Sequence, residues 1–268
     1  MKFGFIGAGN MAGAIIKGMT IATKSFDGKD ILINSKTMAS AQKLAEVCGA
    51  SAASAEEAAS CDILVLAVKP HVLASVLPSL KQIIKNKKPL VVSIAAGKTL
   101  SYLEELLPAE TPIVRIMPNI NAKIGAATSG MCKNKYVTPE GEALVRRIFE
   151  TIGSVITVDE SQFSVFTVLA GSAPAFAYLY MDALARAAVK AGMTKQQALA
   201  IAATTVEGSA KMILESNEHP MALIDQVCSP GGTTIEGIAM LQKHGFEAAL
   251  TDAFDAVLEK DLHIGKKI

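Results

Sequence analysis

A glycine-rich turn near the N-terminus constrains the fold more than any other feature of this sequence. Lys2 to Ile6 has the apolar composition of a short strand, Gly7-Ala8-Gly9-Asn10-Met11-Ala12 follows at once, and an apolar helical stretch comes next. In this G-x-G-x-x-A pattern Gly7 allows a tight turn, Gly9 admits a pyrophosphate, and Ala12 lets the helix pack on the strand. The pattern predicts a Rossmann domain that binds a dinucleotide. A glycine-rich loop that binds nothing is the alternative.

The end of the second expected strand indicates which dinucleotide binds. An NAD site usually has Asp or Glu there to hold the ribose 2′-hydroxyl. Here the strand leads into Asn34, Ser35 and Lys36, which are neutral or basic. These donors favour a 2′-phosphate and therefore NADP(H), with NAD(H) left open. The alternative for Lys36 is an ordinary solvated loop lysine.

Composition favours two globular domains and excludes some partners. Half of the 268 residues are hydrophobic and 19% are charged, which allows a large core. The net charge of +1 comes without a basic stripe, so we expect no nucleic-acid partner. Four dispersed cysteines and four dispersed histidines predict free thiols in a reducing cytoplasm, with no metal site and no disulfide. The early first strand leaves no room for a targeting peptide.

The first half of the chain alternates strands with helices, which predicts an α/β fold with a doubly wound, mostly parallel sheet. We expect a helix over 37–48, a capping box formed by Ser54 and Glu57, and strands over 2–6, 30–34, 62–68, 89–94, 112–117 and 154–158. Beyond residue 161 the expected helices span 162–191, 195–216, 220–227, 234–243 and 246–262. These patterns place a Rossmann domain over residues 1–160 and an all-helical domain over 161–268.

The segment from Gln162 to Met181 carries no charged residue and is long enough to cross a bilayer. Polar residues dilute it, and Gly171-Ser172-Ala173-Pro174 interrupts it. We therefore expect no membrane partner but two helices that meet at a bend and are buried on nearly all sides. Burial this complete in a small domain predicts that a partner subunit covers one face.

A second glycine-rich run, residues 229–237 (SPGGTTIEG), has the features of an anion site without a basic side chain. Gly231 and Gly232 let the backbone approach a ligand, and Thr233 with Glu236 has the spacing of a capping box. Free N–H groups at a helix start suit a carboxylate. An ordinary helix cap that binds nothing is the alternative.

Three loops follow expected strands at the sheet edge where a dinucleotide binds: Ala67-Val68-Lys69-Pro70, Ala95-Ala96-Gly97 and Met117-Pro118-Asn119. Their small residues admit the nicotinamide ribose, and the Asn119 side chain could bond the nicotinamide carboxamide. Plain strand-to-helix turns are the alternative.

Together these motifs (GFIGAGNMA, LAVKP, SIAAG, RIMPN, AGSAPAFAY and VCSPGGTTIEG) closely resemble the pyrroline-5-carboxylate reductase family over essentially the whole chain. The SPGGTT segment is the most specific part. The resemblance implies NAD(P)H-dependent reduction of 1-pyrroline-5-carboxylate to L-proline, the last step of proline biosynthesis. It also implies a Rossmann domain followed by an all-α C-terminal dimerisation domain, in a homodimer or a larger homo-oligomer.

With the residues above, the resemblance gives a set of expected contacts. The expected cofactor residues are Ile6, Gly7, Ala8, Gly9, Asn10, Met11, Asn34, Ser35, Lys36, Ala67, Val68, Lys69, Pro70, Ala95, Ala96, Gly97 and Asn119. The expected substrate residues are Ser229, Gly231, Gly232, Thr233 and Thr234. The sequence departs from the family near the substrate amine, where it has Asn217, Glu218 and Gln226.

The implied chemistry needs few ionisable groups, because orientation of the hydride and the imine does most of the work. The hydroxyl of Thr234 is the candidate to hydrogen-bond the ring nitrogen, either to position it or to relay a proton. A hydroxyacid dehydrogenase of similar build is one alternative, but its usual base is a lysine, and none lies between Lys135 and Lys190. A dinucleotide-sensing regulator is another, but it would have no use for the second anion site.

Overall fold

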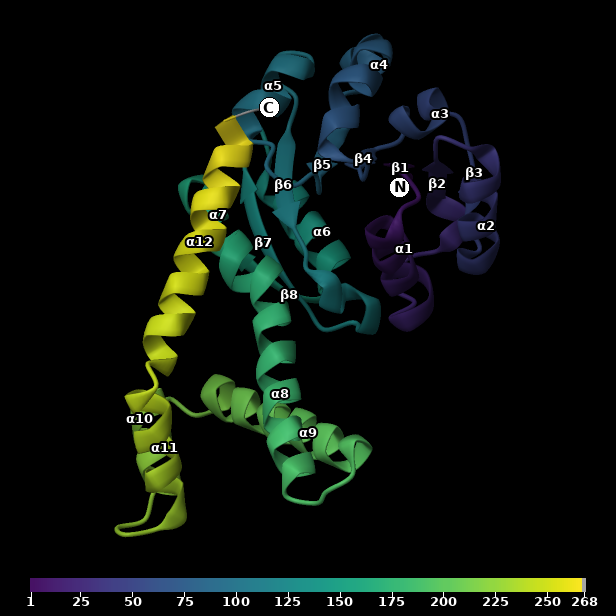
Figure 1. The fold of residues 1–268 in the computed structure, drawn as a ribbon. Helices are drawn as coiled ribbons and strands as arrows, with labels where there is room; N and C mark the ends of the chain where they lie inside the picture. The colour runs from purple at the N-terminus through teal and green to yellow at the C-terminus, as the bar shows by residue number, and fades with distance from the viewer. Residues whose placement is uncertain (267–268) are drawn as a thin grey trace. The chain divides into compact units, whose positions relative to one another are not determined.

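The computed structural model describes residues 1–266, and in it the chain forms two compact units (Figure 1). Unit 1 comprises residues 1–171 and 258–268, and unit 2 comprises residues 172–257. All strands among the described residues lie in unit 1, and unit 2 consists of helices.

Unit 1 is built on an eight-stranded sheet with the order β3-β2-β1-β4-β5-β6-β7-β8. All neighbouring strands are parallel except β6 and β7, which are antiparallel. The strands are β1 (Phe3–Ile6), β2 (Ile31–Asn34), β3 (Ser51–Ala52), β4 (Ile63–Leu66), β5 (Leu90–Ser93), β6 (Ile113–Met117), β7 (Ala127–Lys133) and β8 (Gly153–Thr157). The six expected strands are confirmed: five have trimmed ends, and the one expected over 154–158 begins and ends one residue earlier, at 153–157. The predicted doubly wound sheet is confirmed with them.

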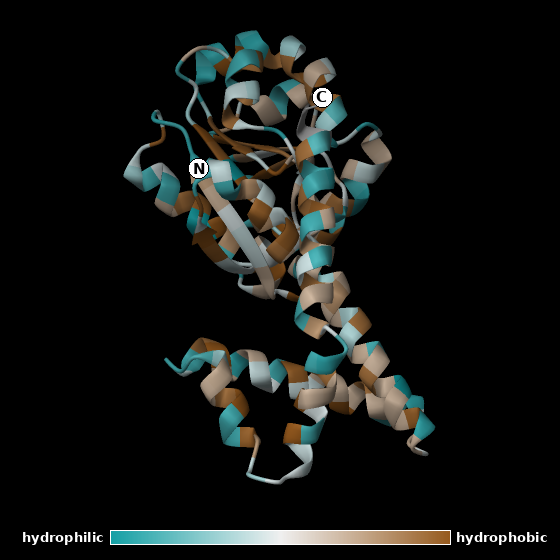
Figure 2. Cartoon of the chain, turned by 60° about the vertical axis from the view of Figure 1, so that its left-hand side comes forward, coloured by the Kyte–Doolittle hydropathy of each residue, from teal (hydrophilic) through white to brown (hydrophobic). Residues whose placement is uncertain are grey.

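Helices cover both faces of this sheet, because the central strands β1, β4 and β5 bury side chains on both sides. One face packs against α1 (Asn10–Lys17), α2 (Met38–Cys48) and α6 (Pro139–Glu150). The other packs against α3 (Ala55–Ala59), α4 (Leu73–Lys87) and α5 (Leu100–Leu106). Figure 2 shows the hydrophobic strands between these two helical layers. In β1 a Cβ on Gly4 would lie 1.9 Å from the carbonyl oxygen of Ala58, so glycine lets α3 approach the sheet.

The sequence prediction missed two strands for different reasons. β3 has only two residues and pairs with β2 through two Cα partners, so it leaves almost no periodic signal. β7 has the sequence ATSGMCK, whose Ala, Ser and Gly residues are poor strand formers. Its pairing with β6 on one side and β8 on the other supplies the backbone partners that its composition does not predict. Tertiary pairing therefore decides both strands.

A buried ion pair ties the strands to the segment that leads toward unit 2. The guanidinium of Arg115 on β6 donates to the carboxylate of Glu160 at 2.9 Å and lies 4.2 Å from the ring centre of Phe163. The same carboxylate accepts from the backbone N–H of Leu100 at 2.7 Å. Because a buried guanidinium without a partner is costly, these contacts fix the start of the helical segment against the sheet.

Residues 160–190 form one long helical segment rather than the two helices expected. It contains α7 (Phe163–Phe166), a π-helical turn η6 (Thr167–Ser172) and α8 (Ala173–Lys190). Pro174 sits in the first turn of α8, where a missing N–H costs little. The wider π-helical turn before Pro174 keeps the chain helical through the Gly-Ser-Ala-Pro run, where the sequence predicts a bend.

Unit 2 contains α8, α9 (Lys195–Glu215), α10 (Pro220–Val227), α11 (Thr233–Lys243) and the first part of α12 (Phe246–Lys266). Within the chain the expected burial of the 162–181 segment is wrong: Leu169 is 67% exposed and Leu179 is 71% exposed. Hydrophobic residues recur along the helices of this unit in Figure 2. Large apolar side chains are exposed on α8, α9 and α11, so unit 2 alone does not cover its own apolar surface.

By length and composition, the helical segment Glu160–Lys190 is also long and apolar enough to cross a membrane, and 22% of its most apolar stretch is buried. One such helix is weak evidence of a membrane span, because apolar helices of soluble proteins have the same properties.

Candidate active site

The glycine-rich turn has the geometry of a dinucleotide loop. Gly7 has φ +116°, and a Cβ there would lie 2.5 Å from the carbonyl oxygen of Ala67, so only glycine fits. Gly9 is the N-cap of α1 with no capping side chain, and nothing lies within 4 Å of the Cβ position it lacks. Ala12 is buried between helix and sheet. The residues present therefore fit a pyrophosphate at the start of α1.

The residues at the end of β2 have unequal roles. The carbonyl oxygen of Asn34 accepts from the backbone N–H of Gly7 at 2.9 Å, and its side-chain amide donates to the carbonyl of Ala53 at 3.2 Å. This side chain therefore holds β2 in place. Ser35 is half-buried and Lys36 is exposed, and neither has a side-chain hydrogen bond or ion pair among the described residues. Contact of Ser35 and Lys36 with a 2′-phosphate remains a prediction.

The loops after β4 and β5 lie beside the same sheet edge. The backbone N–H of Ala67 donates to the carbonyl oxygen of Ile6 and extends the hydrogen bonding between β4 and β1. Lys69 directly precedes the short 3-10 helix η3 (Pro70–Val72). Gly97 turns the chain with φ +70° after the buried Ala95. The topology brings the predicted cofactor residues of these loops to the carboxyl ends of adjacent parallel strands.

Asn119 has a structural task that the sequence did not indicate. Its side-chain oxygen accepts from the backbone N–H groups of Asn121 and Thr128, both at 3.3 Å. Its side-chain nitrogen donates to the carbonyl of Ala170 at 3.0 Å. The residue is 7% exposed, and these bonds hold the 3-10 helix η4 (Ile120–Ile124) in place. A bond from its second side-chain N–H to the nicotinamide carboxamide remains a prediction.

The second glycine-rich run forms a tight turn at the start of α11, but the expected capping box is wrong. Gly232, not Thr233, is the N-cap, and no side chain caps the helix. The N–H of Gly232 bonds the carbonyl of Ser229 at 2.9 Å, and a Cβ on Gly232 would lie 2.4 Å from the Ser229 hydroxyl oxygen. Thr233 is therefore the first helical residue, so its N–H and that of Thr234 lack helical acceptors and suit an anion.

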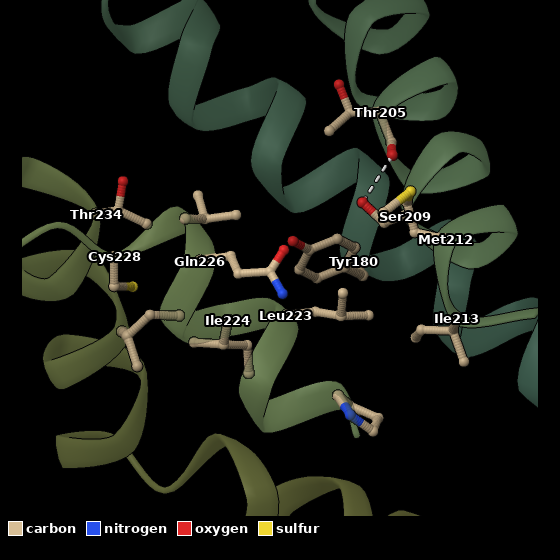
Figure 3. A pocket seen from close by; sticks show the side chains of 13 residues that line it. Tyr180, Thr205, Ser209, Met212, Ile213, Leu223, Ile224, Gln226, Cys228 and Thr234 are labelled. Carbon is tan, nitrogen blue, oxygen red and sulfur yellow. Dashed lines mark hydrogen bonds between the residues drawn. The ribbon is translucent and has the colours of Figure 1, made fainter. Parts of the chain in front are cut away.

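A cavity of 640 Å³ in unit 2 opens beside this helix start (Figure 3). Of the predicted substrate residues, Thr234 lines it, whereas Ser229, Gly231, Gly232 and Thr233 do not. Gln226 of α10 and Tyr180 of α8 also line this cavity, and their side chains lie next to each other in the view of Figure 3. Tyr180 and Ser209 both line this cavity. No sequence motif predicted them, because single residues on amphipathic helices have no local sequence signature.

The segment before α10 is held by its own polar contacts. His219 is the N-cap of α10, and its ring Nδ1 accepts from the N–H of Met221 at 3.2 Å. The side-chain amide of Gln226, near the other end of the helix, donates to the carboxylate of Glu218. Two of the three residues that depart from the family pattern, Glu218 and Gln226, thus interact with each other.

The buried thiols are poor nucleophiles, whereas Cys228 is half-buried and lines the cavity beside α11. All four cysteines are free, and Cys48, Cys61 and Cys132 are buried. Burial raises the pKa of the Cys132 thiol to about 12, with the carboxylate of Glu160 as a second cause. A thiol with such a pKa stays protonated at neutral pH and is a poor nucleophile.

Two family models match the chain, one in each half. "NADP oxidoreductase coenzyme F420-dependent" matches residues 2–97, and "Pyrroline-5-carboxylate reductase dimerisation" matches residues 160–264. The first covers the glycine-rich turn and the first five strands, and the second covers the long helical segment and the SPGGTT run.

Curated relatives match over the full length. A pyrroline-5-carboxylate reductase of Escherichia coli (strain K12) is 41% identical over 99% of this chain and 98% of its own. That of Methanosarcina acetivorans is also 41% identical, over 99% and 98% of the two chains.

Solved structures agree in fold along the whole chain. A pyrroline-5-carboxylate reductase from Coxiella burnetii has a TM-score of 0.91 at 33% identity and covers 98% of this chain and 97% of its own. A pyrroline carboxylate reductase of Plasmodium falciparum with NADP bound has a TM-score of 0.86 at 30% identity, with 99% and 98% of the chains covered.

Proposed function

Because the chain belongs to the pyrroline-5-carboxylate reductase family, we propose that it reduces 1-pyrroline-5-carboxylate to L-proline with NADPH in the last step of proline biosynthesis. The observation that carries this function is the open start of α11, where Gly231 and Gly232 lead into uncapped N–H groups without a basic side chain. Such a site takes a small carboxylate, and the cyclic imine carries one.

The cofactor is held by unit 1. The loop from Ile6 to Met11 binds the pyrophosphate with backbone N–H groups, and Ser35 with Lys36 binds the 2′-phosphate. The loops Ala67 to Pro70 and Ala95 to Gly97 surround the nicotinamide ribose. When bound, NADPH supplies the hydride for the imine carbon. NADH, which lacks the 2′-phosphate, uses the same loops with fewer contacts.

The substrate is held by unit 2. The N–H groups of Thr233 and Thr234 bind the carboxylate, with Ser229, Gly231 and Gly232 shaping the turn. The hydroxyl of Thr234 hydrogen-bonds the ring nitrogen and positions the imine. Fixing both reactants in this way lowers the barrier by on the order of 7–11 kcal/mol, which explains why no strong acid or base is needed in the site.

The family model for dimerisation and the exposed apolar helices support a homo-oligomer of at least two chains. A partner that covers the 162–181 segment removes its apolar side chains from water and accounts for its composition without a membrane. Free thiols fit a cytoplasmic location, and the small net charge of +1 fits an enzyme with no nucleic-acid partner.

The decisive experiment adds 1-pyrroline-5-carboxylate to the purified protein and follows the loss of NADPH absorbance, with NADH in a parallel assay and proline quantified at the end. We expect stoichiometric proline formation and a higher kcat/KM with NADPH. Binding of NADPH without turnover would instead support a dinucleotide-sensing protein.

A further inference from the structure

A groove on unit 1 carries three lysines whose charges no acidic side chain balances. It is a cavity of 550 Å³ along α1 and α2, and the residues that matter here are Gly9, Asn10, Lys17, Lys43 and Lys123. No acidic residue lines it, and none of the three lysines forms an ion pair with a carboxylate among the described residues. The groove therefore has a positive potential that suits an anion.

Lys123 is brought to this groove by a rigid segment far from the glycine-rich motif. It belongs to η4, whose first residues are fixed by the three side-chain bonds of Asn119. The neighbouring Ala122 is buried in the same apolar cluster as Ile15 and Ile16 of α1. The Lys123 backbone is thus held next to α1, while its side chain stays exposed to a ligand.

The start of α1 has no positive side chain of its own to add to its backbone N–H groups. Ala8, Gly9, Asn10 and Met11 offer backbone N–H groups but no positive side chain. A helix N-terminus carries only about half a unit charge, whereas a pyrophosphate is doubly anionic. Of the three lysines, Lys17 stands at the opposite end of α1, roughly 10 Å along the axis from Asn10 at 1.5 Å per residue.

We propose that Lys123 binds the pyrophosphate of the cofactor as a point charge beside the N-terminus of α1. The inference rests on the proposed use of a dinucleotide, and it adds a residue that lies outside every motif. An ammonium suits this task because it is compact and makes no demand on ligand geometry.

Calorimetric titration of the purified enzyme with NADPH and with NADH tests this role without any turnover. Lys123→Gln should weaken both cofactors about tenfold, or ~1.4 kcal/mol, because both contain the pyrophosphate. Lys123→Arg should retain most of the affinity. Lys17→Gln makes the same charge change in the same groove and should stay within about twofold of wild type. The loss in Lys123→Gln should shrink as salt is added, because salt screens the lost attraction.

Unchanged affinity in Lys123→Gln would overturn the assignment. A loss confined to NADPH would also overturn it, because the lysine would then read the 2′-phosphate. An equal loss of cofactor affinity in Lys17→Gln would mean that the overall positive charge of the groove causes the effect. It would therefore reject a specific contact of Lys123 with the pyrophosphate. A wild-type protein that binds neither cofactor would instead refute the proposed function.

Discussion

At the scale of single residues, the proposed role of the Thr234 hydroxyl in positioning the imine can be tested apart from the role of the Thr234 N–H in binding the carboxylate. Thr234 lines the cavity of unit 2, and its N–H stands at the uncapped start of α11. Thr234→Ala keeps this N–H and removes only the hydroxyl. We expect kcat to fall about tenfold or more with little change in KM, because a bond to a nitrogen that gains charge strengthens in the transition state. Steady-state kinetics measure both constants.

The neighbouring threonine provides a matched control for this change. The Thr233 hydroxyl caps nothing, so Thr233→Ala should keep near-wild-type kinetics. Thr234→Ser should recover much of the lost turnover. Wild-type turnover in Thr234→Ala would show that the proton and the positioning come from elsewhere.

At the same scale, we expect an acid introduced at the end of β2 to change the cofactor preference. An acid at the end of β2 repels a 2′-phosphate and accepts from a ribose 2′-hydroxyl, so Asn34→Asp should shift the kcat/KM ratio toward NADH by about tenfold or more. The same change also removes the bond from the Asn34 side chain to the carbonyl of Ala53. Ser35→Glu adds the charge without losing that bond and should shift the preference in the same direction. An unchanged ratio in both variants would contradict the 2′-phosphate assignment.

At the scale of secondary-structure elements, the start of α11 can lose one backbone donor without losing the helix. Proline suits the first helical position, and the preceding Gly232 has the extended φ −79° and ψ 173° that proline prefers before it. Thr233→Pro should therefore leave the melting temperature unchanged. It should weaken proline binding about tenfold, because it removes a hydrogen bond to a carboxylate, worth ~1.5 kcal/mol or more.

Thr233→Ala keeps the N–H and serves as the control in the same titration. NADPH affinity should be unaffected in both variants, since the cofactor residues belong to unit 1. Equal proline affinity in the proline and alanine variants would mean that the carboxylate binds elsewhere.

At the scale of the whole molecule, the exposed apolar surface of the helices predicts an obligate oligomer. Light scattering at micromolar concentration should give at least the mass of a dimer. A charge on α8, as in Leu179→Glu, should reduce the mass and the activity together, because burying an unpaired charge at an interface is costly. Ile124→Glu places the same charge on an equally exposed residue of unit 1 and should leave the mass unchanged. A fully active monomer would refute this prediction.

The sequence by itself determined several features that have a local physical cause. The turn at Gly7 requires a positive φ, and the capping box of Ser54 with Glu57 satisfies its own helix start. Short apolar runs such as Ile63–Leu66 predict buried strands, and the structure confirms this one. These signals were sufficient for the fold class, the glycine-rich loops and the family resemblance.

Only the tertiary structure decided the features that depend on distant partners. β7 exists because β6 and β8 pair with it, and Asn119 is an anchor because Thr128 and Ala170 meet its side chain. Gly232, and not Thr233, is the N-cap of α11 because the backbone N–H of Gly232 bonds the carbonyl of Ser229 and closes the preceding turn. Lys123 lines the groove along α1 because η4 packs against that helix. Most of these contacts join residues that are far apart in the chain. They therefore produce no local periodicity or residue spacing from which the sequence could predict them.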